Sequence, residues 1–280
     1  MGAWRGPMRL VAVAAALGRA WALPPFVVLS EARSGTTWLL SLLNQHPKVR
    51  AKSEILYTAK DSAEVDAKLE AFARAAKRTP RNVATGFKFF DGEGGEHLDG
   101  RRMDRGISAW LSRQNARVVV LERQGLARFV SAQKHSQAVR NSADILETGL
   151  IERKSENFKC ETTDCVDRAR KRRIWINATT VVDRLDRESD RWSSIIAWTR
   201  RYRFADVQYH AYSDLSRDPF CEMKRIFAFL GVPHLRRAEM GNTTLKMGSA
   251  TPRLDIANAD AVEAALRGSR WEGELDRRFG

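Results

Sequence analysis

The feature that most constrains the fold is an apolar run, a short turn and a helix pattern in succession near the start of the chain. Residues 26–29 form an apolar run of the kind a buried parallel strand shows, and residues 31–35 form a turn. The positions at helical spacing after the turn, before Pro47, are Trp38, Leu39, Leu42 and Leu43. Backbone N–H groups converge at such a turn and helix start, which predicts a P-loop-like anion site.

Further strand and helix patterns alternate along the chain. Residues 84–90 (ATGFKFF), 117–121 (RVVVL) and 206–212 (DVQYHAY) are strand candidates, and helices are predicted from near Leu126 and over 187–203. This order predicts an α/β fold with a mostly parallel central sheet and helices on both faces. With 280 residues, 43% of them hydrophobic, the chain suits a single domain over 23–280.

A last helix is marked by its start and its end. Asp218-Pro219 supplies an N-cap followed by proline at the first helical position, and Gly231 supplies the stop. Cys221, on an apolar face of this predicted helix, is expected to be a buried thiol.

The turn departs from the loop of nucleoside-triphosphatases. Against the pattern G-x4-G-K-[ST], Gly35 and Thr37 match, but serine stands at position 30 and Thr36 replaces the lysine. The lysine that reaches the β- and γ-phosphates is therefore missing, and Arg33 places a cation inside the loop instead. This substitution disfavours a P-loop kinase or nucleotidase.

The run PPFVVLSEARSGTTWLLSLLNQHPKVRAKSEIL resembles the 5′-phosphosulfate loop of sulfotransferases that use 3′-phosphoadenosine-5′-phosphosulfate (PAPS). The resemblance covers about residues 25–270 in outline and is specific over 26–56 and 117–131. His-Pro followed by a glutamate is similar to the carbohydrate and tyrosyl-protein branches. The resemblance implies that the 5′-phosphate binds to Arg33, Ser34, Gly35, Thr36 and Thr37.

A second motif agrees with the first. Arg123 follows the strand RVVVL, and Ser131 lies eight residues later on the next helix. In the family this pair binds the 3′-phosphate of the cofactor, and a guanidinium and a hydroxyl suit that task. Lys246 and Arg253 fall where family members carry a basic loop over the same phosphate, although the sequence KMGSATPR departs from the family pattern.

The predicted catalytic groups are Arg33, Glu54 and Lys88. The resemblance makes Glu54 the general base and Arg33 the stabiliser of charge on the bridging oxygen. The alternative for Glu54 is a surface carboxylate that balances nearby lysines and arginines. Lys88 points either into the cleft beside Arg33 or to solvent from an edge strand. His46 is expected to be a turn residue rather than a base.

The predicted function is transfer of a sulfuryl group from PAPS to a hydroxyl or amine, with a carbohydrate as the expected acceptor. A tyrosyl-protein or a small-metabolite acceptor remains open. No metal is expected, because no His, Cys or Asp cluster has metal-ligand spacing.

The net charge of +14 favours an anionic partner such as a polyanionic glycan. It also admits a different class, a basic glycan- or nucleic-acid-binding protein without catalysis, with the basic run 168–173 as support. Dispersed basic residues and the lack of an aromatic-interleaved RNA motif argue against specific nucleic-acid binding.

Residues 1–22 resemble a targeting segment. Arg5 and Arg9 precede the apolar run 10–17, and Ala20-Trp21-Ala22 has the form of a cleavage site. The run is too short for a stable membrane span. Together with sequons at Asn177 and Asn242 and a possible local Cys160–Cys165 pair, this predicts the secretory pathway and the Golgi lumen, with the cytoplasm as the alternative.

Overall fold

The computed structural model describes residues 23–90, 106–123, 125–140, 171, 173–201, 206–241 and 251–277. The predicted targeting segment, both cysteines of the possible local pair and Lys246 lie outside these residues. None of the described helices combines the length and apolar character needed to cross a bilayer.

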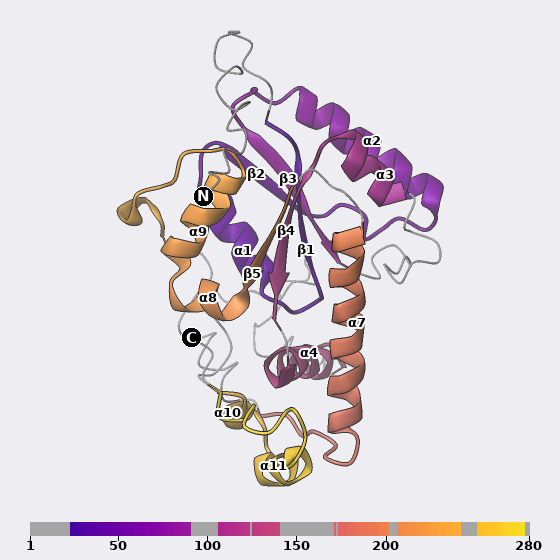
Figure 1. The fold of residues 1–280 in the computed structure, drawn as a ribbon, viewed down its shortest axis with the longest axis vertical. Coiled ribbons are helices and arrows are strands. Elements are labelled where there is room, and N and C mark those ends of the chain that lie inside the picture. Colours follow the sequence, from indigo (N-terminus) through magenta and orange to yellow (C-terminus); the bar gives the residue numbers. More distant parts are fainter. Residues whose placement is uncertain are drawn as a thin grey trace, which may run out of the picture.

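Five parallel strands form the central sheet, in the order β2-β3-β1-β4-β5 (Figure 1). The strands are β1 (Phe26–Ser30), β2 (Val49–Glu54), β3 (Ala84–Phe90), β4 (Arg117–Glu122) and β5 (Asp206–Ala211). All five residues of β1 are buried, as a central parallel strand requires. The predicted α/β class and parallel sheet are confirmed.

Helices cover both faces of the sheet (Figure 1). One face packs against α2 (Ser62–Lys77), α3 (Gly106–Arg113) and α7 (Val181–Arg201), and the other against α1 (Thr36–Leu43), α8 (Tyr212–Arg217) and α9 (Pro219–Phe229). Alternation along β1 explains the two cores, since Val27 and Leu29 enter the first and Phe26 and Val28 the second.

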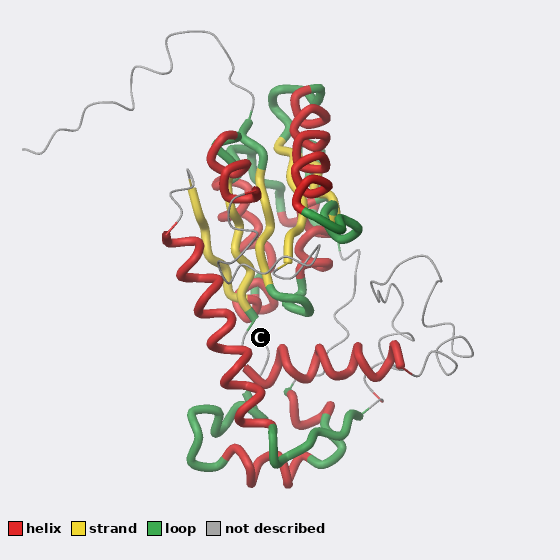
Figure 2. Tube along the Cα trace, turned by 90° about the vertical axis from the view of Figure 1, so that its right-hand side faces the viewer, coloured by secondary structure: helices red, strands yellow, loops and turns green. Residues whose placement is uncertain are grey.

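A third core lies beyond the carboxyl edge of the sheet. It joins α4 (Gly125–Arg140) to the start of α7, to Ile256 just after α10 (Pro252–Asp255) and to α11 (Ala259–Leu266). Figure 2 shows α4 running across below the strands, with the long α7 passing from the sheet to this smaller lobe. The lobe places one face of α4 opposite the ends of the strands.

The start and end of α9 follow the sequence prediction. Asp218 caps it by accepting a hydrogen bond from the Cys221 N–H, Pro219 is the first helical residue, and Gly231 has a φ of 72° just after the end. The expectation of a buried Cys221 thiol is wrong, because the residue is exposed on the outer side of the first turn.

The sequence analysis also missed β2 and misplaced the end of β5. The strand β2 is an edge strand that alternates charged and small residues, so it lacks an apolar signal. Tyr212 begins α8 rather than ending β5, and α7 begins at Val181, six residues before the predicted start.

Candidate active site

The loop between β1 and α1 has the backbone geometry of an anion site. Arg33 and Gly35 have φ values of 70° and 89°, in the left-handed region, and the Ser34 N–H donates to the Glu31 carbonyl at 3.3 Å. Gly35 caps α1 without a side-chain hydrogen bond, and the first turn holds no acidic residue. The N–H groups at the start of α1 therefore face a site that favours an anion.

Two serine hydroxyls at the loop are left for a ligand. Ser30 and Ser34 are buried, and their hydroxyl oxygens have no hydrogen-bond partner among the described residues. Thr36, at the start of α1, is buried as well, whereas Thr37 is half-buried. Buried hydroxyls without partners are costly in a folded protein, so this part of the loop fits a bound anion such as a phosphate.

Tyr212 packs directly against the loop. A β-carbon at Gly35 would lie 2.3 Å from Tyr212 Cε2, so only glycine fits there. The Tyr212 ring also meets the Trp38 ring edge-on, with centroids 6.0 Å apart. Burial raises the pKa of the Tyr212 hydroxyl, so the residue enters the site as a neutral phenol.

Arg123, at the end of β4, reaches the same place. Its Nη1 donates to the Arg33 carbonyl at 3.4 Å, and its guanidinium lies 4.5 Å from the centre of the Tyr212 ring. Burial lowers the pKa of Arg123 from its ordinary value, yet the guanidinium stays charged. The two sequence motifs that were predicted to bind one cofactor are thus in contact.

A buried ion-pair cluster also contacts the loop. Arg128 on α4 pairs with Glu31 of the loop at 3.0 Å and with Glu188 of α7, and its Nη1 donates to the Ala32 carbonyl at 3.4 Å. Glu31 and Arg128 are both buried. A carboxylate inside an anion-binding loop would repel its ligand, and Arg128 offsets that charge.

Glu54 and Lys88 form an ion pair at the ends of β2 and β3. The register shifts between Lys52 and Glu54, where β2 advances two residues for one on β3, and such bulges redirect side chains. Lys88 is 1% exposed and its ammonium lies 4.4 Å from the centre of the Phe90 ring. The edge-strand alternative for Lys88 is wrong, because β3 is an interior strand.

The ion pair with Lys88 also argues against Glu54 as a surface carboxylate. Its side chain is 15% exposed and meets the buried ammonium of Lys88, not the neighbouring basic residues of β2. The carboxylate and the ammonium lie at the carboxyl ends of neighbouring strands, which is where ligands bind in open parallel sheets.

His46 is a turn residue, as expected. Its Nδ1 accepts from the Lys48 N–H at 3.0 Å, so Nε2 carries the proton and donates to the Pro233 carbonyl at 2.7 Å. Burial lowers the pKa of His46 and outweighs the opposing effect of the Pro233 carbonyl. Both ring nitrogens are engaged in the fold, which removes His46 as a base.

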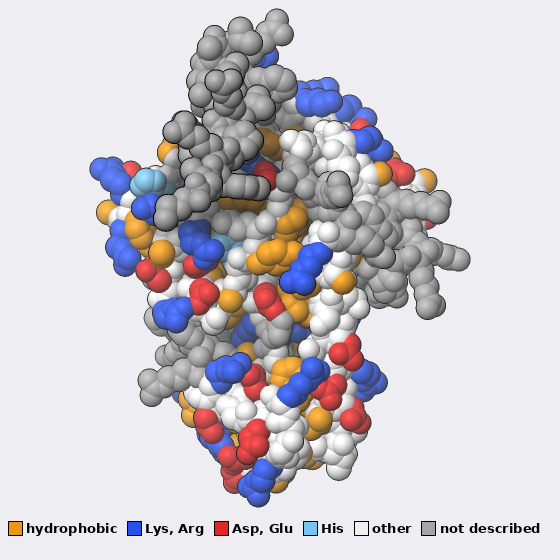
Figure 3. All heavy atoms as spheres, in the orientation of Figure 1, with side chains coloured by type: hydrophobic (Ala, Val, Ile, Leu, Met, Phe, Trp, Pro, Cys, Tyr) orange, Lys and Arg blue, Asp and Glu red, His pale blue; other side chains and the backbone are white. Residues whose placement is uncertain are grey.

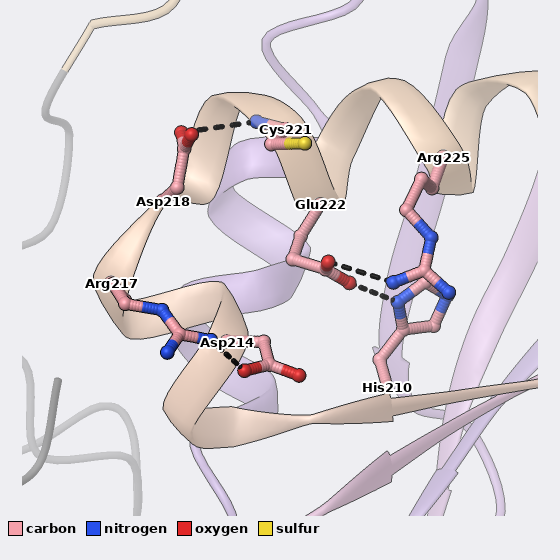
Figure 4. A network of polar contacts seen from close by, with 7 residues as sticks. All are labelled: His210, Asp214, Arg217, Asp218, Cys221, Glu222 and Arg225. Carbon is pink, nitrogen blue, oxygen red and sulfur yellow. Dashed lines mark hydrogen bonds and ion pairs between the residues drawn. The ribbon is translucent and has the colours of Figure 1, made fainter.

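A second buried histidine, His210, is part of a hydrogen-bond network beside α8 and α9 (Figure 4). His210 Nδ1 donates to Glu222 at 2.6 Å, and Arg225 Nη1 donates to the same carboxylate at 2.8 Å. Burial lowers the pKa of His210. Burial alone would raise the pKa of Glu222, but the hydrogen bonds from His210 and Arg225 outweigh it and lower that pKa. This network fixes β5 to α9 just before Tyr212.

Two other predicted residues, Ser131 and Arg253, are less clearly part of this site. Ser131 lies half-buried on α4, and no described contact joins it to Arg123. Arg253 on α10 lies among carboxylates, at 2.7 Å from Asp276 and 3.0 Å from Glu263, and these partners raise its pKa. Its role toward a phosphate stays a prediction.

Sequence reasoning missed several residues of the site. Tyr212, Glu31 and Arg128 all contact the loop or Arg123, and no local pattern singles them out. No group of His, Cys, Asp and Glu among the described residues is arranged to hold a metal ion. The site offers an anion loop, cations and a carboxylate, the parts that transfer of a charged group requires.

The sulfotransferase domain model matches residues 23–246. No curated protein matches the chain significantly in sequence.

Solved structures of sulfotransferases are similar to this chain. A sulfotransferase from Alicyclobacillus acidocaldarius is 18% identical over 88% of this chain and 96% of its own, with a TM-score of 0.44. Mouse sulfotransferase SULT7A1 complexed with PAP is 16% identical over 79% and 63%, with a TM-score of 0.40. Sulfotransferase STF9 from Mycobacterium avium is 15% identical over 87% and 75%, with a TM-score of 0.36.

Proposed function

Because the chain belongs to the sulfotransferase domain family and is a sulfotransferase, we propose that it transfers the sulfuryl group of PAPS to a hydroxyl or amine of an acceptor. The observation that carries the cofactor assignment is the contact between Arg123 Nη1 and the Arg33 carbonyl at 3.4 Å. It joins the loop suited to a 5′-phosphate to the arginine suited to a 3′-phosphate, so that one nucleotide with both groups can span them.

The residues of the loop fit the 5′ end of PAPS. Backbone N–H groups from Ser34 to Thr37, with the hydroxyls of the loop, hold the 5′-phosphate. Arg33 stabilises the charge that develops on the oxygen between phosphorus and sulfur as that bond breaks. Arg123 and Ser131 hold the 3′-phosphate through a charge-assisted fork and a neutral donor.

Glu54 acts as the general base. It accepts the proton of the acceptor hydroxyl as the acceptor oxygen bonds to sulfur, and the sulfur–oxygen bond to the 5′-phosphate breaks to leave adenosine 3′,5′-bisphosphate (PAP). Lys88 positions the Glu54 carboxylate through the ion pair. Preorganised charge and position account for the catalysis, as in phosphoryl transfer.

Thermal shift with three ligands tests the cofactor assignment. PAP at micromolar concentration is expected to raise the melting temperature, because a ligand that binds the folded state alone stabilises it. ATP should have little effect at the same concentration, and stabilisation by heparin agrees with the proposal only where PAP stabilises the protein as well. Stabilisation by ATP alone would indicate a nucleotidase, and stabilisation by heparin alone would indicate a non-catalytic binding protein.

The proposed acceptor is a carbohydrate, preferably an anionic polysaccharide. The net charge of +14 supports an anionic partner. On the face in Figure 3, however, blue and red side chains are interspersed over the smaller lobe, so the charge does not form one basic field there. A screen of glycans, tyrosyl peptides and small hydroxyl compounds with labelled PAPS would decide the class, and transfer only to the latter two would contradict the proposal.

The proposed location is the lumen of the secretory pathway, in the Golgi. The basic and apolar pattern of residues 1–22 supports it. Asn177 of the first sequon is exposed, and its side chain accepts hydrogen bonds from the Thr179 N–H and hydroxyl. Expression in a secretory host should give a glycosidase-sensitive mass shift that Asn177→Gln reduces; a chain without any such shift would favour the cytoplasmic alternative.

A further inference from the structure

The helix α4 presents three polar residues toward one side at intervals of three. Arg128, Ser131 and Lys134 are neighbours on the helix surface, because residues three apart lie one above another. Arg128 at one end contacts the phosphate loop through Glu31 and the Ala32 carbonyl. The other end of this stripe, Lys134, was not part of either sequence motif.

Lys134 meets a buried carboxylate from a distant part of the chain. Its Nζ lies 2.7 Å from Asp255 Oδ1, with the side chains 19% and 4% exposed. Asp255 belongs to α10, and its carbonyl accepts from the Ile174 N–H at 2.8 Å, which fixes the backbone there. The ammonium of Lys134 is therefore held at a defined place on the α4 surface.

The geometry of the helix also brings the Lys134 side chain near Ser131. Side chains of an α-helix lean toward its N-terminus, so the head of Lys134 extends over the turn that carries Ser131. The negative charge of Asp255 also acts on Arg123, where it raises the pKa against the larger effect of burial. One carboxylate is thus electrostatically coupled to both cations.

The ion pair leaves donors of Lys134 for another anion. An ammonium has three N–H donors, and Asp255 is the one partner of Lys134 among the described residues. A partly buried ion pair by itself adds little stability, since desolvation offsets the attraction. Holding a cation in place for a ligand is a use that such a pair can serve.

We infer that Lys134 is a third ligand of the 3′-phosphate, beside Arg123 and Ser131, and that Asp255 positions its ammonium. This inference rests on the proposed function, because it concerns the same nucleotide. Lys134 would then be a determinant of specificity for PAPS over nucleotides that lack the 3′-phosphate.

Isothermal titration of PAP and of AMP, which lacks the 3′-phosphate, tests the inference. Lys134→Met keeps the stem and removes the charge, and it should weaken PAP by about tenfold or more while AMP changes less than about twofold. Lys77→Met, at the exposed end of α2, removes the same charge far from the site and is the matched control. Its affinities for both nucleotides should stay at the wild-type values.

Asp255→Asn separates binding from packing. It weakens the same ion pair but keeps the ammonium, so it should reduce the preference for PAP over AMP by less than Lys134→Met does, even if the melting temperature falls as much in both variants. Equal losses for PAP and AMP in Lys134→Met, or an unchanged PAP affinity, would overturn the inference. A wild-type protein without preference for PAP over AMP would instead contradict the proposed cofactor itself.

Discussion

The ring of Tyr212 lies so close to Gly35 that a β-carbon there would be 2.3 Å from Tyr212 Cε2. The same ring lies under the guanidinium of Arg123 at 4.5 Å. Tyr212 therefore packs against both the loop and Arg123, the two elements proposed to bind phosphates, and the shape of the loop depends on having no side chain at Gly35.

Gly35→Ala should weaken PAP binding by about tenfold or more and lower the melting temperature. The substitution forces alanine into a φ of 89°, a strain on the order of 1–3 kcal/mol, and pushes the Tyr212 ring away. Gly241→Ala is the matched control, because a β-carbon there meets nothing within 4 Å. If both variants bound PAP like the wild type, the loop would not need the observed backbone.

Glu54→Gln should lower turnover by about 10²–10⁴ with nearly unchanged PAP affinity, since the amide keeps the shape but cannot accept the proton. Steady-state rates with labelled PAPS, beside titration of PAP, measure the two effects separately. Glu70→Gln, in a surface pair with Arg113, is the control and should retain wild-type rates. Near-wild-type turnover in Glu54→Gln would mean that another group takes the proton.

Arg33→Ala should differ from Glu54→Gln by lowering turnover and PAP affinity together. The guanidinium is proposed to meet the 5′-phosphate in both the ground state and the transition state. Circular dichroism of both variants checks that the loop and α1 still fold. A loss of turnover in Arg33→Ala with full PAP affinity would restrict Arg33 to the transition state.

The sequence predicted the strand, loop and helix that build this site because they are neighbours in the chain. The strand β1, the loop and α1 are contiguous, so apolar runs and turn residues were enough to find them, and the family resemblance singled out Arg123 directly after β4. The edge strand β2 was missed because its charged residues face solvent in alternation, and with it the position of Glu54 opposite Lys88.

The ion pairs that support the loop and α4 could not be predicted from the sequence. Glu31 and Arg128 are 97 residues apart, and Lys134 and Asp255 are 121 apart, so only the folded chain brings them together. Arg253, a basic residue predicted to lie at a phosphate, has carboxylate partners from the C-terminal region in the structure. Charge and position in the sequence did not reveal those partners.

Stability should fall in two stages as the pH is lowered. The pKa values of His46 and His210 are lowered from 6.5 in the folded protein. Just below pH 6.5 the unfolded chain therefore binds more protons than the folded chain, and the free energy of unfolding falls. The pKa of Glu222 is lowered from 4.5, so its contribution is present above that pH and is lost as the pH falls through the folded value. Urea unfolding from pH 8 to well below pH 4.5 measures both stages.

His46→Gln isolates the first stage. The amide nitrogen replaces the donor to Pro233 without a group that titrates, so the slope of stability against pH below about 6.5 should become smaller. His234→Gln, at an exposed position next to Pro233, is the control and should keep the wild-type slope. An unchanged slope in His46→Gln would show that His46 does not bind its proton differently in the two states.

The affinity for PAP, measured by isothermal titration of the wild type and of Arg123→Ala, tests the central claim most directly. The account predicts micromolar binding by the wild type and a loss of about tenfold or more in Arg123→Ala, because a charge-assisted contact to the 3′-phosphate is removed. Binding of PAP that is unchanged in Arg123→Ala, or no binding of PAP by the wild type, would contradict it.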